Sequence, residues 1–333
     1  MLIKKKLRVE KLEKVSGFDP SRHGRLQEIR ENHYRIVKNI SVAGDAPKEV
    51  LKIYKYQKGR RTIHNPRLWV AHIVKTGHKW YPYESITEYL LNRLGEELGM
   101  HMAESGLKII NGQIRFLSKY FLRGRDEILE HGAELYGGYL NDLEFVEEIE
   151  QQGKARDFFT LKLTQDTLEH IYPSCSSELY KSFLKMIVFD AIIGNNDRHF
   201  YNWGVVRPLD GRTPQFAPIY DTARALFWNV SEKKIKEIDK ENKRREVFLE
   251  KYVRSSRSKI GLEGKPVENH FDIIKRVAEM EVIDVGELIN EKSLKICNEL
   301  IDNEFRYIVS EARINLIKDC LNLRMRKLLE LLP

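Results

Sequence analysis

The sequence predicts an α+β protein with two lobes, a small lobe rich in β-strands followed by a larger helical lobe. Residues 35–122 hold several short β-branched and aromatic runs and one amphipathic helix. From about residue 123 onward the apolar residues recur with helical spacing instead. The 333 residues, 42% of them hydrophobic, suffice for a sizeable core without disulfides. We therefore expect an N-terminal lobe over 1–122, a helical lobe over 123–333 and a ligand cleft between them.

The first lobe is expected to contain two strands followed by a helix. EVLKIYKY (49–56) is aromatic and β-branched, and LWVAHIVK (68–75) is apolar on both faces. The segment 85–99 follows, with a helical apolar stripe that consists of Ile86, Leu90, Leu94 and Leu98. Gly99 is expected to end this helix, because glycine readily adopts the left-handed conformation that commonly terminates one.

Two hairpins and a buried helix are expected farther along the chain. Residues 107–121 predict a hairpin around Asn111-Gly112, a two-residue turn signal. A helix that is apolar over most of its surface then precedes a short polar stretch. After that stretch, NWGVVRP and QFAPIYD are typical of two short strands, with a turn at Asp210-Gly211 between them.

The polar stretch GNNDRHFYNWGVV (194–206) gathers charged and amide side chains at the junction of two buried elements. Burying such groups without partners is unfavourable, so the stretch is either a hydrogen-bonded corner or a site for something charged. Asn202 and Asp221 lie at about equal distances from the turn of the second hairpin, and such residues sit opposite each other. With Asp197 just upstream, we expect two carboxylates and an amide oxygen to converge.

These residue types suit phosphoryl transfer. Carboxylate and amide oxygens bind Mg²⁺, which takes its remaining ligands from phosphates and water. The reaction also needs a carboxylate that accepts the proton of the attacking hydroxyl and a lysine that reaches the phosphates. Lys75 ends a buried strand and is the candidate lysine, with Glu88 on the next helix as its partner. The alternatives are a snorkelling lysine, a solvent-facing Glu88 and a solvated Asp-Arg-His corner.

Charge and cysteine content restrict the expected partners and compartment. The net charge of +8 favours acidic or phosphate-bearing partners. The segment 233–259 is rich in Lys and Arg but also carries acids, which favours a solvated helix face over direct nucleic-acid binding. The cysteines are far apart and have no metal-ligand spacing, and neither a signal peptide nor a membrane-spanning run is visible. We therefore expect a cytoplasmic protein with no membrane partner.

Several of these stretches resemble the HipA-type serine/threonine kinases, a bacterial family with a protein-kinase-like fold. FDAIIGNNDRHFYNWGVV looks like the catalytic loop of that family, and FAPIYDTARAL looks like its metal-binding stretch. ISVAGDAPKEVLKIY and AHIVKTG look like its phosphate-binding loop and the strand with the nucleotide lysine, and TEYLLNRLGEELGM is similar to its sheet-lobe helix. The resemblance covers about residues 40–228 and implies a bilobal, HipA-like fold in the short stand-alone form.

The resemblance implies a role for each matching residue. Asp197 would be the catalytic base that orients the acceptor hydroxyl. Asn202 and Asp221 would bind Mg²⁺, and Lys75 would contact the phosphates of ATP. Glu88 would be the helix partner of Lys75.

Further nucleotide contacts are also implied by the resemblance. The backbone around Ser118 and Tyr120 would be the hinge that meets adenine. Ser41 and Gly44 lie in the phosphate-binding loop, whose N–H groups would cradle phosphate although the loop lacks G-x-G-x-x-G. Ser41 matches a loop serine that some members autophosphorylate, which ejects the loop and silences the enzyme, because a second dianion would repel ATP. The alternative is a serine that only bonds the loop backbone.

The function that the resemblance implies is an ATP- and Mg²⁺-dependent protein kinase acting on Ser or Thr hydroxyls. We expect a toxin kinase of a toxin–antitoxin module. The expected partners are a protein substrate, such as an aminoacyl-tRNA synthetase or another translation factor, and a small antitoxin protein.

Two other functions stay open. D-R-H-x-x-N also resembles the catalytic loop of phosphoinositide kinases, so a lipid or small-molecule kinase is one alternative. Those enzymes usually place their metal-binding Asp in a DFG, whereas Asp221 lies in IYDTA. A pseudokinase or binding module is the other alternative, and the presence of Asp197, Asn202, Asp221 and Lys75 argues against it.

Overall fold

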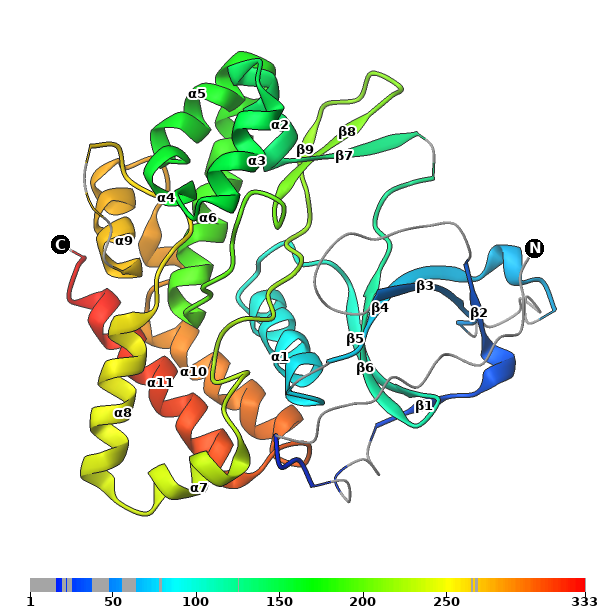
Figure 1. The fold of residues 1–333 in the computed structure, drawn as a ribbon, viewed down its shortest axis with the longest axis vertical. Helices are drawn as coiled ribbons and strands as arrows, with labels where there is room; N and C mark the ends of the chain where they lie inside the picture. Colours follow the sequence, from blue (N-terminus) through cyan, green and yellow to red (C-terminus); the bar gives the residue numbers. More distant parts are fainter. Residues whose placement is uncertain are drawn as a thin grey trace.

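The computed structural model describes residues 16–19, 22, 26–37, 48–55, 64–77, 80–124, 126–264, 266 and 269–332. Two of the predicted site residues, Ser41 and Gly44, lie outside the described residues. Figure 1 shows a β-sheet to one side, a body of helices to the other, and α1 (Tyr83–Glu97) between them. The architecture is α+β, as the sequence predicts.

A six-stranded sheet contains the strands of the first lobe. Its spatial order is β1-β5-β6-β4-β3-β2, in which β1 pairs parallel with β5 and the other neighbours are antiparallel. The strands predicted at 49–56 and 68–75 are confirmed as β3 and β4. The bounds are β1 (Glu28–Ile29), β2 (Tyr34–Ile36), β3 (Lys48–Ile53), β4 (Val70–Lys75), β5 (Ser105–Ile110) and β6 (Gln113–Lys119), with short 3-10 turns η2 (Glu31–His33) and η3 (Pro66–Leu68).

The turn between β5 and β6 has the predicted conformation. Asn111 and Gly112 both have a positive φ, +52° and +71°. This is the backbone that a two-residue hairpin needs to match the twist of its strands, and Asn-Gly adopts it with little strain. The β5–β6 hairpin is thereby confirmed.

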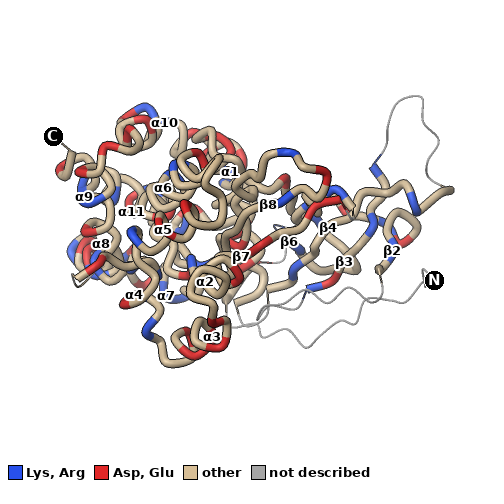
Figure 2. The backbone as a smooth tube through the Cα atoms, turned by 90° about the horizontal axis from the view of Figure 1, so that it is seen from above, with Lys and Arg blue, Asp and Glu red and all other residues tan. Residues whose placement is uncertain are grey.

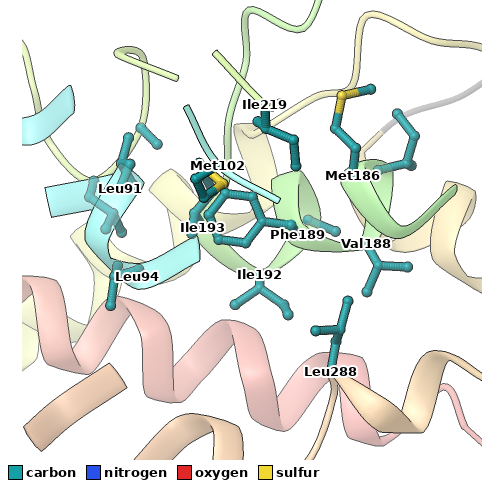
Figure 3. Packing of buried hydrophobic residues seen from close by; sticks show 14 of the residues in the cluster. Leu91, Leu94, Met102, Met186, Val188, Phe189, Ile192, Ile193, Ile219 and Leu288 are labelled. Atoms are coloured by element: carbon teal, nitrogen blue, oxygen red, sulfur yellow. The ribbon is translucent and has the colours of Figure 1, made fainter. Parts of the chain in front are cut away.

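Helix α1 joins the sheet to the helical body. Its predicted apolar stripe is buried at Ile86, Leu90 and Leu94, which belong to the main core. Gly99 follows the helix with a φ of +74°, as expected for a residue that ends a helix. In Figure 3, Leu91 and Leu94 of this helix lie beside Met102 and the end of α6.

The helical body is built around α6 (Ser176–Ile193), the buried helix expected before the polar stretch. Figure 3 shows Met186, Val188, Phe189, Ile192 and Ile193 of α6 extending on different sides into the core, so the C-terminal half of this helix is buried all round. The other elements are α2 (Gly132–Leu140), α3 (Leu143–Gln151), α4 (Ala155–Phe158), α5 (Leu161–Ile171), α7 (Glu232–Asp239), α8 (Asn242–Ser255), α9 (His270–Glu279), η4 (Val285–Glu287), α10 (Glu291–Leu300), the π-helical turn η5 (Ile301–Phe305) and α11 (Glu311–Leu329).

The second predicted hairpin forms, but its register corrects the expected pairing of Asn202 with Asp221. It consists of β8 (Gly204–Pro208) and β9 (Gln215–Phe216), and β7 (Glu127–His131) pairs on the other side of β8. Val205 faces Phe216, so the same register would place position 219 opposite Asn202. The ladder also ends well before Asp221, and other contacts therefore determine where that residue lies.

The basic segment at 233–259 has the mixed surface that the sequence indicates. Figure 2 shows acidic and basic residues side by side over α8. Along α7 and α8 acidic residues alternate with lysines and arginines, which is typical of a solvated helix face. Among the helices that the structure describes, none combines the length and the apolar character needed to cross a membrane.

Lowering the pH is expected to destabilise the fold through His270. This imidazole is 1% exposed, and burial together with the positive charges of Arg324 and Arg156 holds its pKa well below the ordinary histidine value of about 6.5. Below about pH 6.5 the unfolded chain binds a proton that the folded chain excludes, so the free energy of unfolding should fall by up to about 2 kcal/mol by pH 5.

Urea unfolding at pH 7.5, 6.5 and 5 measures this contribution in the wild type and in His270→Gln. The stability lost between pH 6.5 and 5 should be smaller in the variant, because glutamine does not titrate. Identical pH dependence in the two proteins would show that His270 contributes nothing.

Candidate active site

A buried ion pair organises the polar stretch at 194–206. Arg198 donates to both carboxylate oxygens of Asp190, through Nε at 2.8 Å and Nη2 at 3.0 Å. The two side chains are only 1% and 3% exposed. Asn195 donates its amide to the same carboxylate at 2.9 Å, and the backbone N–H groups of Gly194 and Asn195 donate to the Asp190 carbonyl. The stretch is therefore wrapped around the last turn of α6 as a hydrogen-bonded corner.

Arg198 also connects two segments that are distant in sequence. Its Nη1 donates at 2.7 Å to the carbonyl of Asn202 and at 2.7 Å to the carbonyl of Tyr220. Burial would lower the pKa of Arg198, but the charge of Asp190 and its hydrogen bonds outweigh burial and raise it. One permanently charged guanidinium thus holds the residue before Asp221 next to Asn202, which the predicted hairpin pairing does not do.

Asp197 lies on the surface of this corner with its backbone fixed. Its carbonyl accepts from the side chain of Asn202 at 2.6 Å and from the N–H of His199 at 2.9 Å. Its carboxylate oxygen Oδ2 lies 3.0 Å from Nε of Arg224, and the Asp197 side chain is 25% exposed. The carboxylate is thereby accessible from solvent, while the bond from Asn202 uses that residue's amide nitrogen and not its oxygen.

Asp221 lies between two lysines of the sheet. Nζ of Lys75 lies 2.7 Å from its Oδ1, and Nζ of Lys48 lies 3.3 Å from its Oδ2. Nζ of Lys75 also lies 2.5 Å from Oε1 of Glu88 on α1, so the predicted Lys75–Glu88 ion pair is present. Four charged groups from β3, β4, α1 and the segment after β9 therefore meet at one point.

The register of the sheet explains why an anion is needed there. Lys48 and Lys75 are direct partners in the antiparallel pair of β3 and β4. Like charges opposite each other across two strands repel, and both of these side chains are largely shielded from water. The carboxylate of Asp221 neutralises the repulsion, so the sheet contributes a cationic edge that favours anionic ligands.

The pKa shifts in this cluster have separable causes. Burial disfavours the charged form of Lys75, but Asp221 and Glu88 outweigh that effect and raise its pKa. Burial would raise the pKa of Asp221, yet Lys75 and Lys48 bring it well below its ordinary value. For Glu88, burial outweighs the attraction of Lys75 and the pKa is raised. Asp221 is therefore the carboxylate that stays ionised and suited to a cation.

The backbone at Asp221 is held in an uncommon conformation. Its φ is +55°, in the left-handed region, which is uncommon for a residue other than glycine. Such strain persists where the surroundings impose it, and it clusters at functional sites. Here Ile219 accepts from the N–H of Ala103 at 3.0 Å and donates to the carbonyl of His101 at 2.7 Å, which fixes the approach to Asp221.

The segment after Asp221 is short and fastened to the C-terminal helix. Arg313 of α11 is 2% exposed and donates to the carbonyls of Phe227 and Val230 at 3.1 and 2.6 Å. It also binds Glu232 at 2.6 Å, and its guanidinium lies 3.7 Å from the ring centre of Tyr83 at the start of α1. One buried arginine therefore couples this segment to the helix that carries Glu88.

The predicted hinge residues lie where β6 leaves the sheet. Ser118 is within the strand, paired with Ile73 and Ser105. The N–H of Tyr120 donates to the carbonyl of Ala71 at 2.9 Å. That N–H is therefore already used by the sheet. The Phe121 ring lies 6.0 Å from that of Tyr220.

A half-open cavity of about 480 Å³ lies away from these residues. It is bordered by the connection from α1 to β5, by one face of α6 and by β9, and its lining includes Met100, Lys185 and Phe216. None of the predicted site residues that the structure describes lines it. Geometry and charge, not the size of this cavity, identify the candidate site.

The structure thus brings most predicted site residues into one connected set. Ion pairs join Lys75 to Glu88 and Asp221, and a hydrogen bond joins Asn202 to Asp197. Sequence reasoning missed four residues that complete the set, namely Lys48, Asp190, Arg198 and Arg224. Two local signals were present in the sequence, namely Lys48 at the start of β3 and Asp190 one turn before the end of α6. Neither signal indicates which residue is its ion-pair partner.

A sheet lobe with a buried Lys75–Glu88 pair meets the helical lobe at Asp221, and a second aspartate, Asp197, lies on the loop after α6. This arrangement defines a protein with a kinase-like fold. The chain belongs to the family of HipA-like C-terminal domains, whose family model matches residues 40–282. This confirms the family that the motifs indicate.

Individual relatives agree with the family assignment. The chain is 27% identical over 152 residues to the serine/threonine-protein kinase CtkA of Helicobacter pylori, covering 45% of this chain and 43% of CtkA. It is 26% identical over 164 residues to a Haemophilus influenzae protein that carries the name of a kinase, covering 45% and 44%. The chain therefore matches less than half the length of these curated relatives.

The fold is also similar to a solved structure. The crystal structure of the Helicobacter pylori proinflammatory kinase CtkA aligns with 85% of this chain and 92% of its own chain, with a TM-score of 0.64 and 18% identity. This likeness concerns the fold. It confirms the α+β, kinase-like, HipA-like architecture that the sequence predicts.

Replacing Asp190 with alanine should destabilise the protein strongly. The change leaves Arg198 buried without its carboxylate, and breaking a buried pair in this way costs about 3–5 kcal/mol. Urea unfolding measures the loss. Arg212→Gln is the matched control, because Arg212 binds Asp210 at 2.8 Å with both side chains about half exposed, and such a pair contributes at most about 1 kcal/mol. A similar small loss for both variants would contradict the structural role of Asp190.

Proposed function

We propose that this protein is an ATP- and Mg²⁺-dependent kinase that transfers the γ-phosphoryl group to Ser or Thr hydroxyls of proteins. The observation that carries the proposal is the assembled charge cluster, in which Lys75 binds both Glu88 and Asp221. Active kinases need this Lys–Glu pair and a metal-binding Asp in place together. The names of the relatives support the same reaction class.

The residues present fit a magnesium ion bound with phosphates. Asp221 is an ionised carboxylate, and Asn202 offers an amide oxygen from the loop that Arg198 ties to the same place. Among the described residues the structure has no group of three or more His, Cys, Asp or Glu that would hold a metal by itself. Mg²⁺ suits such a site, because it binds one or two protein ligands and completes its shell with phosphates and water. When bound, it would neutralise charge on the phosphates.

In this mechanism Lys75 and Lys48 bind phosphate oxygens of ATP, and Glu88 orients Lys75. Asp197 accepts a hydrogen bond from the acceptor hydroxyl. The hydroxyl oxygen forms a bond to the γ-phosphorus while the bond from that phosphorus to the bridging β–γ oxygen breaks. The proton passes to the Asp197 carboxylate, and ADP leaves with the electron pair of the broken bond.

The identity of the acceptor is proposed from the family resemblance alone. We propose a translation factor or aminoacyl-tRNA synthetase as the protein substrate, and a small antitoxin as a partner. Autophosphorylation at Ser41 stays a prediction, because Ser41 lies outside the described residues. Comparing labelled transfer from ATP to proteins with transfer to lipids would separate the proposal from the lipid-kinase alternative.

Replacing Asp197 with alanine should reduce phosphoryl transfer by about 10²–10⁴-fold, the usual contribution of a general base. The assay is transfer of ³²P from labelled ATP to protein in a cell lysate. Circular dichroism and nucleotide binding should be close to wild type, because the Asp197 side chain is partly exposed. Full activity of Asp197→Ala with every acceptor would show that this residue is not the base.

Replacing Lys48 with methionine should weaken ATP binding without abolishing transfer. The variant keeps most of the apolar stem but loses one charge-assisted contact, worth about 1.5–3 kcal/mol, so KM for ATP should rise about 10- to 150-fold. Initial rates against ATP concentration measure the change. Lys52→Met is the matched control, since Lys52 lies on the same strand and binds the carbonyl of Arg67 at an exposed position. An unchanged KM in Lys48→Met would exclude Lys48 from phosphate binding.

A further inference from the structure

Arg224 forms an ion pair with the residue that we assign as the catalytic base. Its Nε lies 3.0 Å from Oδ2 of Asp197. The contact joins the Nε edge of the guanidinium to the carboxylate at Oδ2. Arg224 was not among the residues that sequence reasoning selected, although it lies only three positions after Asp221.

The arginine is fixed at both its backbone and its side chain. Its carbonyl accepts from the N–H of Asn196 at 3.2 Å, next to Asp197 itself. The side chain of Asn196 in turn accepts from Ser256 Oγ at 3.1 Å and from the N–H of Arg257 at 2.7 Å. The guanidinium of Arg224 lies 5.4 Å from the ring centre of Trp228. These contacts hold the Nε edge toward Asp197.

The contribution of this pair to stability is expected to be small. The two side chains are 41% and 25% exposed, and ion pairs at that exposure contribute at most about 1 kcal/mol. The contacts around Arg224 fix its orientation, although its ion pair with Asp197 adds little to the stability of the fold. A role in the proposed phosphoryl transfer explains this arrangement better than a role in folding does. Arg198 directly follows Asp197 in the sequence, but its side chain binds Asp190 on the buried side of the loop and not the carboxylate of Asp197.

We propose that Arg224 is a positioning residue that orients the carboxylate of Asp197 for proton acceptance. The inference rests on the proposed kinase function. Arg224 binds Oδ2 and thereby prevents rotation of the carboxylate about its Cβ–Cγ bond. The other carboxylate oxygen, Oδ1, then receives the proton of the acceptor hydroxyl. At the same time the hydroxyl oxygen bonds to the γ-phosphorus and ADP departs. Misplacement of a reacting group by about 1 Å is enough to lower a rate about 10²-fold.

The test compares Arg224→Gln, Arg224→Lys and the control Arg212→Gln in the full chain. Labelled ATP and a fixed protein acceptor serve as substrates, and kcat and KM for ATP are determined separately. Arg224→Gln should lower kcat about 10- to 100-fold with KM for ATP within about 3-fold of wild type. Arg224→Lys should recover part of kcat, because an ammonium group retains the charge but not the guanidinium geometry. Arg212→Gln should match the wild type.

A double variant separates positioning from a general structural effect. In the Asp197→Asn background the Arg224→Gln change should alter the residual rate less than about 3-fold, because the base that Arg224 orients is already absent. An equal loss in both backgrounds would overturn the proposal. The proposal would also be overturned if the wild type is active and Arg224→Gln has an equal or higher kcat. An effect of Arg224→Gln on KM for ATP alone, with kcat unchanged, would overturn it as well.

The outcomes also distinguish this inference from the proposed function. If the wild type transfers phosphate and Arg224→Gln is unaffected, only the role of Arg224 is wrong. If the wild type binds no nucleotide and transfers no phosphate to protein, both the proposed function and the role of Arg224 are wrong. Thermal unfolding of each variant shows whether a loss of rate comes from a loss of fold.

Discussion

The buried ion pair between Asp190 and Arg198 is the interaction on which the candidate site depends. Removing two charges from water is tolerated only when all their hydrogen bonds are made, and here they are directed to a loop and to two backbone carbonyls. Those carbonyls belong to Asn202 and Tyr220. Asp190 lies near the end of the buried helix α6. From there the pair determines the path of the loop that carries Asp197 and the path of the chain that leads to Asp221.

A second constraint is electrostatic and acts between the sheet and the helical body. Lys48 and Lys75 face each other across β3 and β4, so this edge of the sheet needs a negative group. Asp221 supplies that group from the helical body, and Glu88 supplies another from α1. Contact between the lobes and assembly of this charge cluster, which we propose to bind phosphate, therefore depend on the same ion pairs. In the proposed complex, phosphate oxygens would share this cationic edge with Asp221.

Elements that depend on local signals were predictable, and contacts between distant segments were not. The Asn111-Gly112 turn, the apolar stripe of α1 and the glycine that ends it follow from propensities within a few residues. The juxtaposition of Asn202 and Asp221 was attributed to a hairpin register, but β9 ends too early and a different register forms. Arg198, which the sequence showed only as part of a motif, connects the two segments instead. Its guanidinium binds the carbonyls of both Asn202 and Tyr220.

The sequence by itself determined the α+β order of elements, the family and the residue types suited to phosphoryl transfer, because these follow from periodicity and short motifs. It also indicated Lys75 and Glu88 as a pair. Only the tertiary structure decided that Lys48 joins Lys75 at Asp221 and that Arg224 meets Asp197. The physical reason is that ion pairs between distant residues depend on strand register and loop packing, which no local stretch of the chain specifies.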